Sequence, residues 1–316
     1  MRVLRVDGRR PDRLQFRWRP DTPPLLEVDP GQEIEIQIPD SSCGQLTPAS
    51  RSADLARVDW ERVDGAVGPL AVRDAEPGDR LGVDLLSIRP GSWGWTGVFR
   101  NFGLLRGRFD DALTRWSLRK GVALARDGPL AGLTLPLRPM LGVIAVLPSD
   151  GEHPMIPPER FGGNMDLPLV TQGSRVELPV QVPGAGLSVG DPHGRQGWGE
   201  LCGTGIEMPA RVRLRCTLRK RAPLPGPRLR SPAVPTAEPA GLTTTGIGPD
   251  PRVAALRATE AMIDLLAERG WSPAAAYALC SLVGLLRIAE AVDEPNWTVT
   301  VTVSEEFERP PARPRR

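Results

Sequence analysis

Lysine, histidine and cysteine are all scarce in this sequence of 316 residues. Lys120 and Lys220 are the only lysines, so nearly all of the 40 basic residues are arginines, and with 38 acidic residues the net charge is +2. Proteins that bind nucleic acids carry clustered basic residues, so this balance predicts no nucleic-acid partner. The 4 cysteines show no CxxC spacing. We therefore expect neither a zinc finger nor a disulfide framework, but reduced thiols in a cytoplasmic protein.

Long hydrophobic runs are absent as well. The N-terminal stretch contains no apolar core of the length found in signal peptides. The most apolar run, Ala274 to Val292, is interrupted by Arg287 and Glu290, whereas a membrane span needs about 20 residues with few or no charges. We therefore expect neither export nor a membrane partner, and we interpret this run as a buried helix.

Alternating patterns predict a chain rich in β-strands. Apolar and polar residues alternate at 33–38, 81–85, 211–218 and 297–303, and a short apolar run between prolines spans 140–147. On the strand at 211–218 one face is apolar and the other carries arginines, which we expect to be solvated or paired with acids of a neighbouring strand. Residues 221–240 are dense in proline and are expected to form a loop or linker.

Two helices are predicted late in the chain. Asp250-Pro251 supplies an N-cap followed by proline at the first helical position, and Gly270 marks the end. One apolar stripe is expected to face the core: Val253, Leu256, Ile263 and Leu266. Ser272-Pro273 repeats the start signal for a second helix, which we expect to run to about Ala291. The tail at 309–316 is expected to be disordered, so the chain reads as mainly β with a late helix pair.

Two irregular regions carry residues suited to binding. The polar loop at 40–45 leaves the end of a predicted strand, and it is either a binding loop or a plain solvated turn. The region 91–118 is rich in aromatic residues among glycines whose spacing argues against a helix. It lines a pocket, forms a subunit interface or packs in the core. Its aromatic residues are Trp93, Trp95, Phe99, Phe102, Phe109 and Trp116.

The stretch from His153 to Glu207 gathers the residues best suited to chemistry. Both histidines of the chain lie in it, together with acids that stand close to glycines. Glycine lets the backbone approach a ligand, while carboxylates and imidazoles carry protons or bind metals. The stretch therefore predicts a shaped polar pocket, whose candidate residues are His153, Asp166, Asp191, His193 and Glu200.

Asp191 and His193 are two residues apart, and on an extended segment such residues point to the same face. They can converge on one metal ion or form a hydrogen-bonded pair, with Glu200 folded back over them and Asp166 as a further ligand. A carboxylate-rich site with one histidine suits Zn²⁺ or another divalent ion that activates water. Spacing leaves a second interpretation open, in which these acids only cap backbone N–H groups in turns.

Motifs in this stretch, in their order and spacing, resemble the acetamidase/formamidase family, whose members hydrolyse small amides to a carboxylate and ammonia. They are GGNMD at 162–166, LPV at 178–180, GAGLSVGDPH at 184–193, QGWGE at 196–200 and CGTGIE at 202–207. The resemblance continues at 44–47, 75–79, 93–103, 153–158 and 280–293, so it covers most of the chain. It implies a single β-sandwich or jelly-roll-like domain at 1–308 with helical elaborations, assembled as a homo-oligomer.

The resemblance implies that the chain hydrolyses the C–N bond of a small linear amide. Our hypothesis is that a divalent ion, zinc in the first instance, is held by Asp191, His193 and Asp166. Glu200 takes a proton from water and delivers one to the leaving ammonia. Backbone N–H groups around Gly162-Gly163 stabilise the developing oxyanion. Substrate contacts are expected from four further positions: Gly163, Asn164, Trp198 and His153.

Two positions depart from the family pattern. Trp198 stands where the family has the aspartate of its GDGE motif, and Leu285 stands where an aspartate usually follows SLVG. Trp198 either reshapes the pocket for a bulkier, less polar amide or disables catalysis. The alternative function is therefore a non-catalytic homologue that binds amides or a metal, or that acts as a scaffold.

Other amide-hydrolysing sites fit this sequence poorly. Glu-Lys-Cys and Ser-Ser-Lys sites need a catalytic lysine. Lys120 follows an arginine, and Lys220 lies between two arginines at a predicted strand end, so we expect both to be solvated. Cys202 lies close to the predicted site and is either a nucleophile or a small packing residue.

Overall fold

Two large sheets form the body of the protein, whose computed structural model describes residues 3–233 and 240–310. Neighbouring strands are antiparallel except for the parallel pairs β1–β5 and β4–β6. The larger sheet has nine strands, in the order β1 (Leu4–Asp7), β5 (Glu33–Ile38), β17 (Ala210–Arg219), β7 (Arg80–Pro90), β15 (Arg175–Pro179), β18 (Arg228–Ser231), β19 (Gly241–Gly248), β21 (Trp297–Ser304) and β20 (Leu285–Glu290).

The second sheet has six strands and supplies most of the backbone beneath the functional site. Its order is β14 (Gly162–Asn164), β12 (Met140–Ala145), β16 (Leu187–His193), β6 (Ala66–Val72) and β2 (Leu14–Gln15), with β4 (Leu26–Val28) beside β6. A two-stranded sheet pairs β13 (His153–Pro154) with β3 (Arg17–Trp18). Short 3₁₀ helices lie at Pro11–Arg13, Ser52–Arg57, Trp60–Arg62 and Glu305–Phe307.

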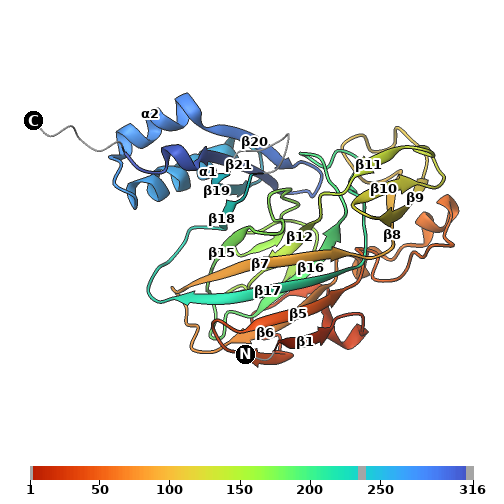
Figure 1. The fold of residues 1–316 in the computed structure, drawn as a ribbon, viewed down its shortest axis with the longest axis horizontal. Helices are drawn as coiled ribbons and strands as arrows, with labels where there is room; N and C mark the ends of the chain where they lie inside the picture. Colours follow the sequence, from red (N-terminus) through yellow and green to blue (C-terminus); the bar gives the residue numbers. More distant parts are fainter. Residues whose placement is uncertain (1–2, 234–239, 311–316) are drawn as a thin grey trace, which may run out of the picture.

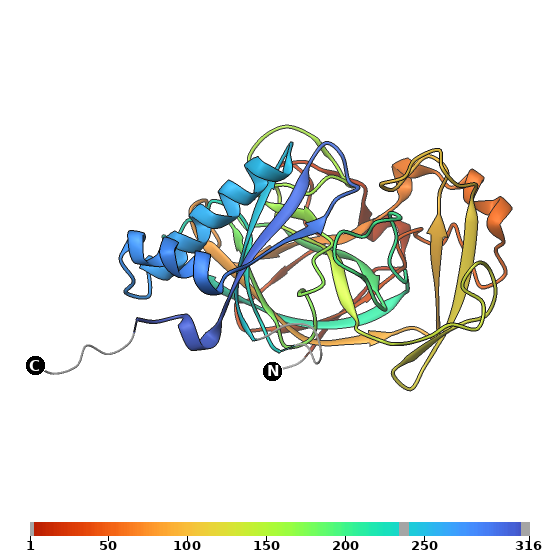
Figure 2. The same cartoon turned by 90° about the horizontal axis from the view of Figure 1, so that it is seen from above.

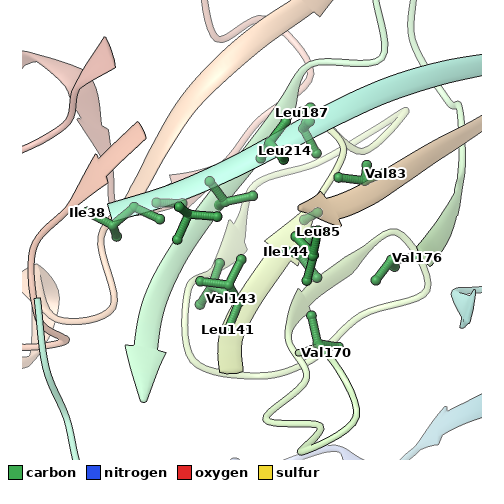
Figure 3. Close-up of a cluster of buried hydrophobic side chains, with 14 of the residues drawn as sticks. Ile38, Val83, Leu85, Leu141, Val143, Ile144, Val170, Val176, Leu187 and Leu214 are labelled. Carbon is green, nitrogen blue, oxygen red and sulfur yellow. The ribbon is translucent and has the colours of Figure 1, made fainter. Parts of the chain in front are cut away.

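The core lies between the two large sheets (Figure 3). Val83 and Leu214 come from the nine-stranded sheet, and Val143, Ile144 and Leu187 come from the six-stranded sheet. All five are at most 1% exposed. This face-to-face packing of two sheets confirms the mainly β prediction and places β12 and β16, which carry the site, on a rigid support.

Alternation in the sequence located several strands correctly. β5 spans the predicted residues 33–38 and alternates half-buried with buried positions. On β17 the apolar face is buried, whereas the arginines pair with acids of adjacent strands, as Arg213 does with Glu33 and Arg215 with Asp84. Pairing of opposite charges on neighbouring strands fits one of the two expectations for this face.

A four-stranded sheet carries the aromatic region at one end of the molecule (Figures 1 and 2). It runs in the order β11 (Thr134–Pro136), β10 (Val122–Ala125), β9 (Ala112–Arg119) and β8 (Trp93–Val98). Trp95 and Phe99 pack with Leu46, Leu55 and Leu113 in a separate small core. The region is therefore neither a helix nor a plain loop, because its glycines allow strand pairing with close backbone contacts.

The late helices lie at the opposite end, over β19 and β21 (Figures 1 and 2). α1 (Pro251–Ala267) is capped by Asp250, whose carboxylate accepts from two backbone N–H groups, as the sequence predicts. The buried residues agree with the predicted stripe only at Leu266: Leu256 is 53% exposed, and the core is met by Ala254, Ala258, Met262, Leu265 and Leu266. Small alanines face the sheet because the helix packs closely against it.

The second predicted helix is wrong in length. α2 (Pro273–Val283) ends before Gly284, and the residues that follow form β20, which pairs with β21. α2 is also largely exposed, with Leu282 81% accessible. The interpretation of 274–292 as one buried helix fails because long-range pairing with β21 claims its second half.

The proline-rich region is also more ordered than the sequence predicts. β18 lies inside 221–240 and pairs with both β15 and β19. Residues 234–239 of that region and 311–316 of the predicted tail lie outside the described residues. Within the described ranges, no helix has the length and apolar character needed to cross a membrane.

Candidate active site

Acids and one histidine converge on a buried point beside β16. His193 Nε2 lies 2.9 Å from Asp191 Oδ2 and 2.9 Å from Glu207 Oε2. Its other ring nitrogen, Nδ1, lies 3.8 Å from Asp166 Oδ1 and 3.7 Å from Glu200 Oε1. All five side chains are nearly inaccessible to solvent. The structure thus brings together every acid that the sequence predicted for the site, and it adds Glu207.

The backbone at this point is strained. Asp64, Asp166, Asp191 and Glu200 all have positive φ, between 42° and 53°. Residues other than glycine, asparagine and aspartate rarely adopt this region, and such strain gathers at functional sites. Asp191 and His193 therefore do not converge through a regular extended strand, as the sequence argument assumed, but through a local kink that turns the Asp191 carboxylate toward the imidazole.

Gly142 in β12 forms the floor beneath these acids. A Cβ atom at this position would lie 2.2 Å from Asp191 Oδ2 and 2.5 Å from Asp166 Oδ1. The Gly142 carbonyl oxygen also accepts from the backbone N–H groups of Met165 and Asp166. Glycine is required here because the two carboxylates occupy the space that a side chain would fill.

Burial and mutual repulsion raise the pKa values of three of the acids around His193. Burial first, and the charge of Asp191 second, raise the pKa of Asp166 well above 3.8, while burial and then Asp166 raise that of Glu200 well above 4.5. Burial raises the pKa of Glu207 to about 7. Burial opposes a charged imidazole at His193, but Asp191 and Glu207 outweigh it and raise its pKa well above 6.5.

This donor set can hold a metal ion. Two groups, Asp166–Asp191–His193 and His193–Glu200–Glu207, each bring three ligand atoms within 4.8 Å of one another. Among the described residues, no hydrogen-bond donor reaches Asp166 Oδ1, Asp191 Oδ1 or Glu200 Oε1. Buried carboxylate oxygens without donors are costly, and a divalent cation would satisfy them. Carboxylates with one imidazole therefore fit a metal chemically.

The acids face a cavity with about 470 Å³ of empty space, part of it open to solvent. Its polar wall includes Asp64, Asn164 and Asp293 besides the acids around His193. The apolar part of the lining is mostly aromatic: Val58, Trp60, Val63, Trp95, Phe99 and Phe102. Trp60 closes against Phe99 and Phe102, with ring centroids 4.9 Å apart in both pairs. A small molecule with one polar and one apolar end suits such walls.

The loop predicted at 40–45 belongs to this cavity. Ser41 and Ser42 line it and are buried. Asp40 accepts hydrogen bonds from the Ser42 hydroxyl, at 2.5 Å, and from Trp95 Nε1, at 3.0 Å. The loop is therefore no plain solvated turn, because its serines are buried in the cavity lining and its Asp40 is hydrogen-bonded to the indole of Trp95.

Of the four predicted substrate contacts, only Asn164 lines the cavity, where its Nδ2 donates to Asp293 Oδ2 at 2.8 Å. Gly163 lies in β14, paired with Ile144 of β12, so its backbone serves the sheet. The neighbouring Gly162 N–H donates to the Glu159 carbonyl oxygen, which removes it as an oxyanion donor. His153 lies outside the lining, in β13, with Nε2 3.1 Å from the Asp150 carbonyl oxygen.

Trp198 also lies outside the lining of the cavity. Its ring packs against the main core, and the Arg287 guanidinium of β20 lies 5.1 Å from the ring centroid. The next residue, Gly199, donates from its backbone N–H to the Ala289 carbonyl oxygen at 2.9 Å. Trp198 therefore fastens the Glu200 turn to β20, and the other departure, Leu285, begins that same strand.

Three acids of the cavity were not predicted as site residues from the sequence. Glu207 ends the CGTGIE motif and Asp293 ends the segment 280–293, so motif membership was a signal for both. Asp64 lies outside every motif that we recognised, and its backbone N–H donates to the Ser41 carbonyl oxygen. Only the fold brings it to the cavity.

Comparison with known proteins shows the family to which this chain is similar. The model of the Acetamidase/Formamidase family matches residues 6–153 and 150–308. A formamidase of Methylophilus methylotrophus is 30% identical over 259 residues, which cover 65% of this chain and 63% of that protein. An acetamidase of Mycolicibacterium smegmatis is 30% identical over 255 residues, which cover 61% of this chain and 62% of that protein. The chain thus spans somewhat less than two-thirds of the length of each.

A solved structure extends the similarity over the whole fold. The crystal structure of an acetamidase from Bacillus halodurans has a TM-score of 0.85 and 27% sequence identity, and the match covers 97% of this chain and 98% of that chain. Because the family model spans both halves of the sequence and the fold agrees throughout, this chain belongs to the acetamidase/formamidase family.

Proposed function

We propose that this protein hydrolyses the C–N bond of a small linear amide, giving a carboxylate and ammonia. The observation that carries the proposal is the buried group of acids around His193, open to a cavity whose other wall is aromatic. Related proteins are named formamidase and acetamidase, which supports the same reaction. The amide group would lie against the acids, and its acyl substituent would lie against Phe99 and Phe102.

A divalent ion, zinc in the first instance, would be held by His193, Asp191 and a second carboxylate from Asp166 or Glu207. Such an ion polarises a carbonyl oxygen and activates water when bound. Glu200 takes the proton from water and passes one to the departing nitrogen. Its raised pKa suits both steps, since a carboxylate that takes a proton from water must hold it long enough to pass it on.

Ammonia release across an amide panel tests the reaction. Formamide, acetamide, propanamide and benzamide vary the acyl group. Formation of 4-aminobutanoate from 2-pyrrolidinone, whose ring opening releases no ammonia, tests whether a cyclic amide is accepted. We expect turnover of at least one linear amide, dependent on His193, with His153→Gln as the matched control for His193→Gln. Metal content measured on both variants tests the ligand role, and a fully active protein without metal would exclude that role.

A non-catalytic homologue remains the competing function. Its support was Trp198 and Leu285, but the Trp198 ring packs against Arg287 of β20, Leu285 begins that strand, and neither residue is in the cavity lining. The three acids that the sequence predicted for the site, Asp166, Asp191 and Glu200, all line the cavity, which favours an enzyme. Silence across the panel, with amide or metal binding still detected by calorimetry, would favour the binder.

Assembly and location belong to the same proposal. We expect a homo-oligomer, as the family resemblance implies, and light scattering on the purified protein would measure its mass. We also expect a cytoplasmic protein, and fractionation of producing cells would test this.

A further inference from the structure

We infer that Gln196 is a positioning residue, which fixes the imidazole of His193 so that Nδ1 carries hydrogen and Nε2 is the metal-binding nitrogen. The inference deepens the proposed function and rests on it for the identity of the ligand atoms. The hydrogen bond between Gln196 and His193 stands independently of any metal.

The orientation of the Gln196 amide follows from its partner on the main chain. Its Nε2 donates to the Asp166 carbonyl oxygen at 2.6 Å, and a carbonyl oxygen can only accept. The amide oxygen Oε1 must then face the other way, where it lies 2.7 Å from His193 Nδ1. Because an amide oxygen also only accepts, Nδ1 is the donor in this bond.

The opposite ring nitrogen is therefore the one that can offer its lone pair to a metal. Nε2 lies 2.9 Å from one oxygen of Asp191 and 2.9 Å from one oxygen of Glu207. A proton on Nε2 joins the imidazole to these carboxylates in the metal-free protein, and a divalent cation bound by Nε2 and the two carboxylate oxygens would replace it. Hydrogen bonding of the second ring nitrogen is the usual way in which proteins orient a metal-binding histidine.

This orientation divides the four acids around His193 by the nitrogen that they face. Asp191 and Glu207 face Nε2 and become the carboxylate ligands. Asp166 and Glu200 lie near Nδ1, at 3.8 Å and 3.7 Å, on the side that Gln196 occupies. The division favours Glu207 over Asp166 as the second carboxylate ligand and leaves Glu200 free to carry protons.

Imidazole ¹⁵N NMR tests the inference directly, because the chain has only two histidines. In protein labelled with [¹⁵N]histidine, His153→Gln leaves a single imidazole to observe. We expect a slowly exchanging Nδ1–H in the metal-free protein and, after loading with ¹¹³Cd²⁺, coupling from cadmium to Nε2. Coupling to Nδ1 would overturn the assignment.

Gln196→Met removes both hydrogen bonds and keeps the length of the side chain. It should lose the slowly exchanging Nδ1–H and weaken Zn²⁺ binding, measured by chelator competition, by about 10- to 100-fold. Gln196→Glu keeps an acceptor for Nδ1 and should retain the Nδ1–H signal. Gln181→Met is the matched control, since Gln181 lies outside the cavity lining and accepts from the exposed Ser149 N–H.

Three outcomes would contradict the inference in whole or in part, and they distinguish the role of Gln196 from the assignment of the metal ligands. A Gln196→Met protein with an unchanged Nδ1–H and unchanged zinc affinity overturns it. A wild-type protein that binds neither ion overturns the ligand assignment together with the proposed metal site. Amide hydrolysis with no metal bound would do the same, while the Nδ1–H signal would still decide whether Gln196 holds the imidazole.

Discussion

At the scale of single residues, the site depends on acids whose side chains are almost completely buried. Asp166, Asp191, Glu200 and Glu207 are each at most 7% exposed. A buried carboxylate either keeps its proton or acquires a cation. Each acid is thus useful only with its neighbours in place, and small changes at one position should have large effects.

Glu200→Gln should lower kcat by about 10²- to 10⁴-fold, as expected for loss of a general base. The amide has nearly the same shape but cannot take a proton from water, so KM should change little. Steady-state ammonia release measures both constants. Glu159→Gln is the matched control, because Glu159 lies outside the cavity lining and is half-exposed; equal losses in both variants would remove Glu200 from its role.

Gly142→Ala should disrupt the site although it replaces no charged residue. The new methyl group would overlap Asp191 and Asp166, so both carboxylates must move. We expect metal affinity to fall by about 10- to 100-fold, as when other supports of a metal site are lost. Gly197→Ala is the control, since nothing lies within 4 Å of its added Cβ. Metal content and activity like those of the wild type in Gly142→Ala would contradict this packing argument.

At the scale of elements, β20 links the end of the nine-stranded sheet to the Glu200 turn. The sequence predicted helix here because the apolar run 274–292 follows the helix start signal at Ser272-Pro273. Pairing with β21 decides otherwise, and β20 then bonds to Gly199 and stacks Arg287 on Trp198. Secondary-structure propensity depends on neighbouring residues, so it cannot predict pairing with a strand that comes later in the chain.

Trp198→Ala should therefore act on stability and kcat and leave KM nearly unchanged. Loss of the half-buried ring and its stacking on Arg287 should cost about 2 kcal/mol of unfolding free energy. Trp198→Phe keeps an aromatic ring over Arg287 and should recover part of this loss. Urea unfolding and steady-state kinetics measure the effects. Unchanged stability with an altered KM for bulky amides would place the indole in the substrate cavity after all.

At the scale of the whole molecule, the fold holds several carboxylates close together at one buried place, and a bound cation would offset their mutual repulsion. The site draws on all three larger sheets, since β16, β8 and the residues after β20 each contribute to the cavity. Stability of the fold and occupancy of the site should consequently be linked.

Removal of metal should destabilise the protein more as pH rises. The raised pKa of Glu207, from 4.5 to about 7, means that the folded state holds a proton that the unfolded chain releases, so increasing pH favours unfolding. By this linkage Glu207 alone costs about 3 kcal/mol above pH 7. Asp166 and Glu200 act with the same sign. A bound cation keeps these carboxylates charged and offsets the cost.

Thermal melts with zinc and with a chelator, at pH 5 to pH 8, measure this effect. The gap in Tm between the two conditions should widen with pH. His193 adds to the trend, because its raised pKa also leaves the folded state with a proton that is lost as pH increases. The Gly142→Ala protein should show a much smaller gap. Identical melts at every pH would show that the site holds no metal.

The sequence by itself determined the elements whose signals are local. Alternation fixed β5 and β17, a cap and a proline fixed the start of α1, and motif order fixed the family and the acids at 166, 191 and 200. These signals are readable because side-chain period and capping depend only on near neighbours in the chain.

Tertiary structure alone decided what depends on distant partners. It ended α2 at Val283, and it packed Trp198 against β20 rather than in the cavity. It brought Asp64 into the cavity lining. It also oriented the Gln196 amide between the Asp166 carbonyl oxygen and the His193 imidazole. Each of these outcomes depends on which strands pair and which loops meet, and the free energy of such contacts comes from residues far apart in the sequence. The chemistry could therefore be named from the motifs, but the division of the acids between ligand and proton carrier required the fold.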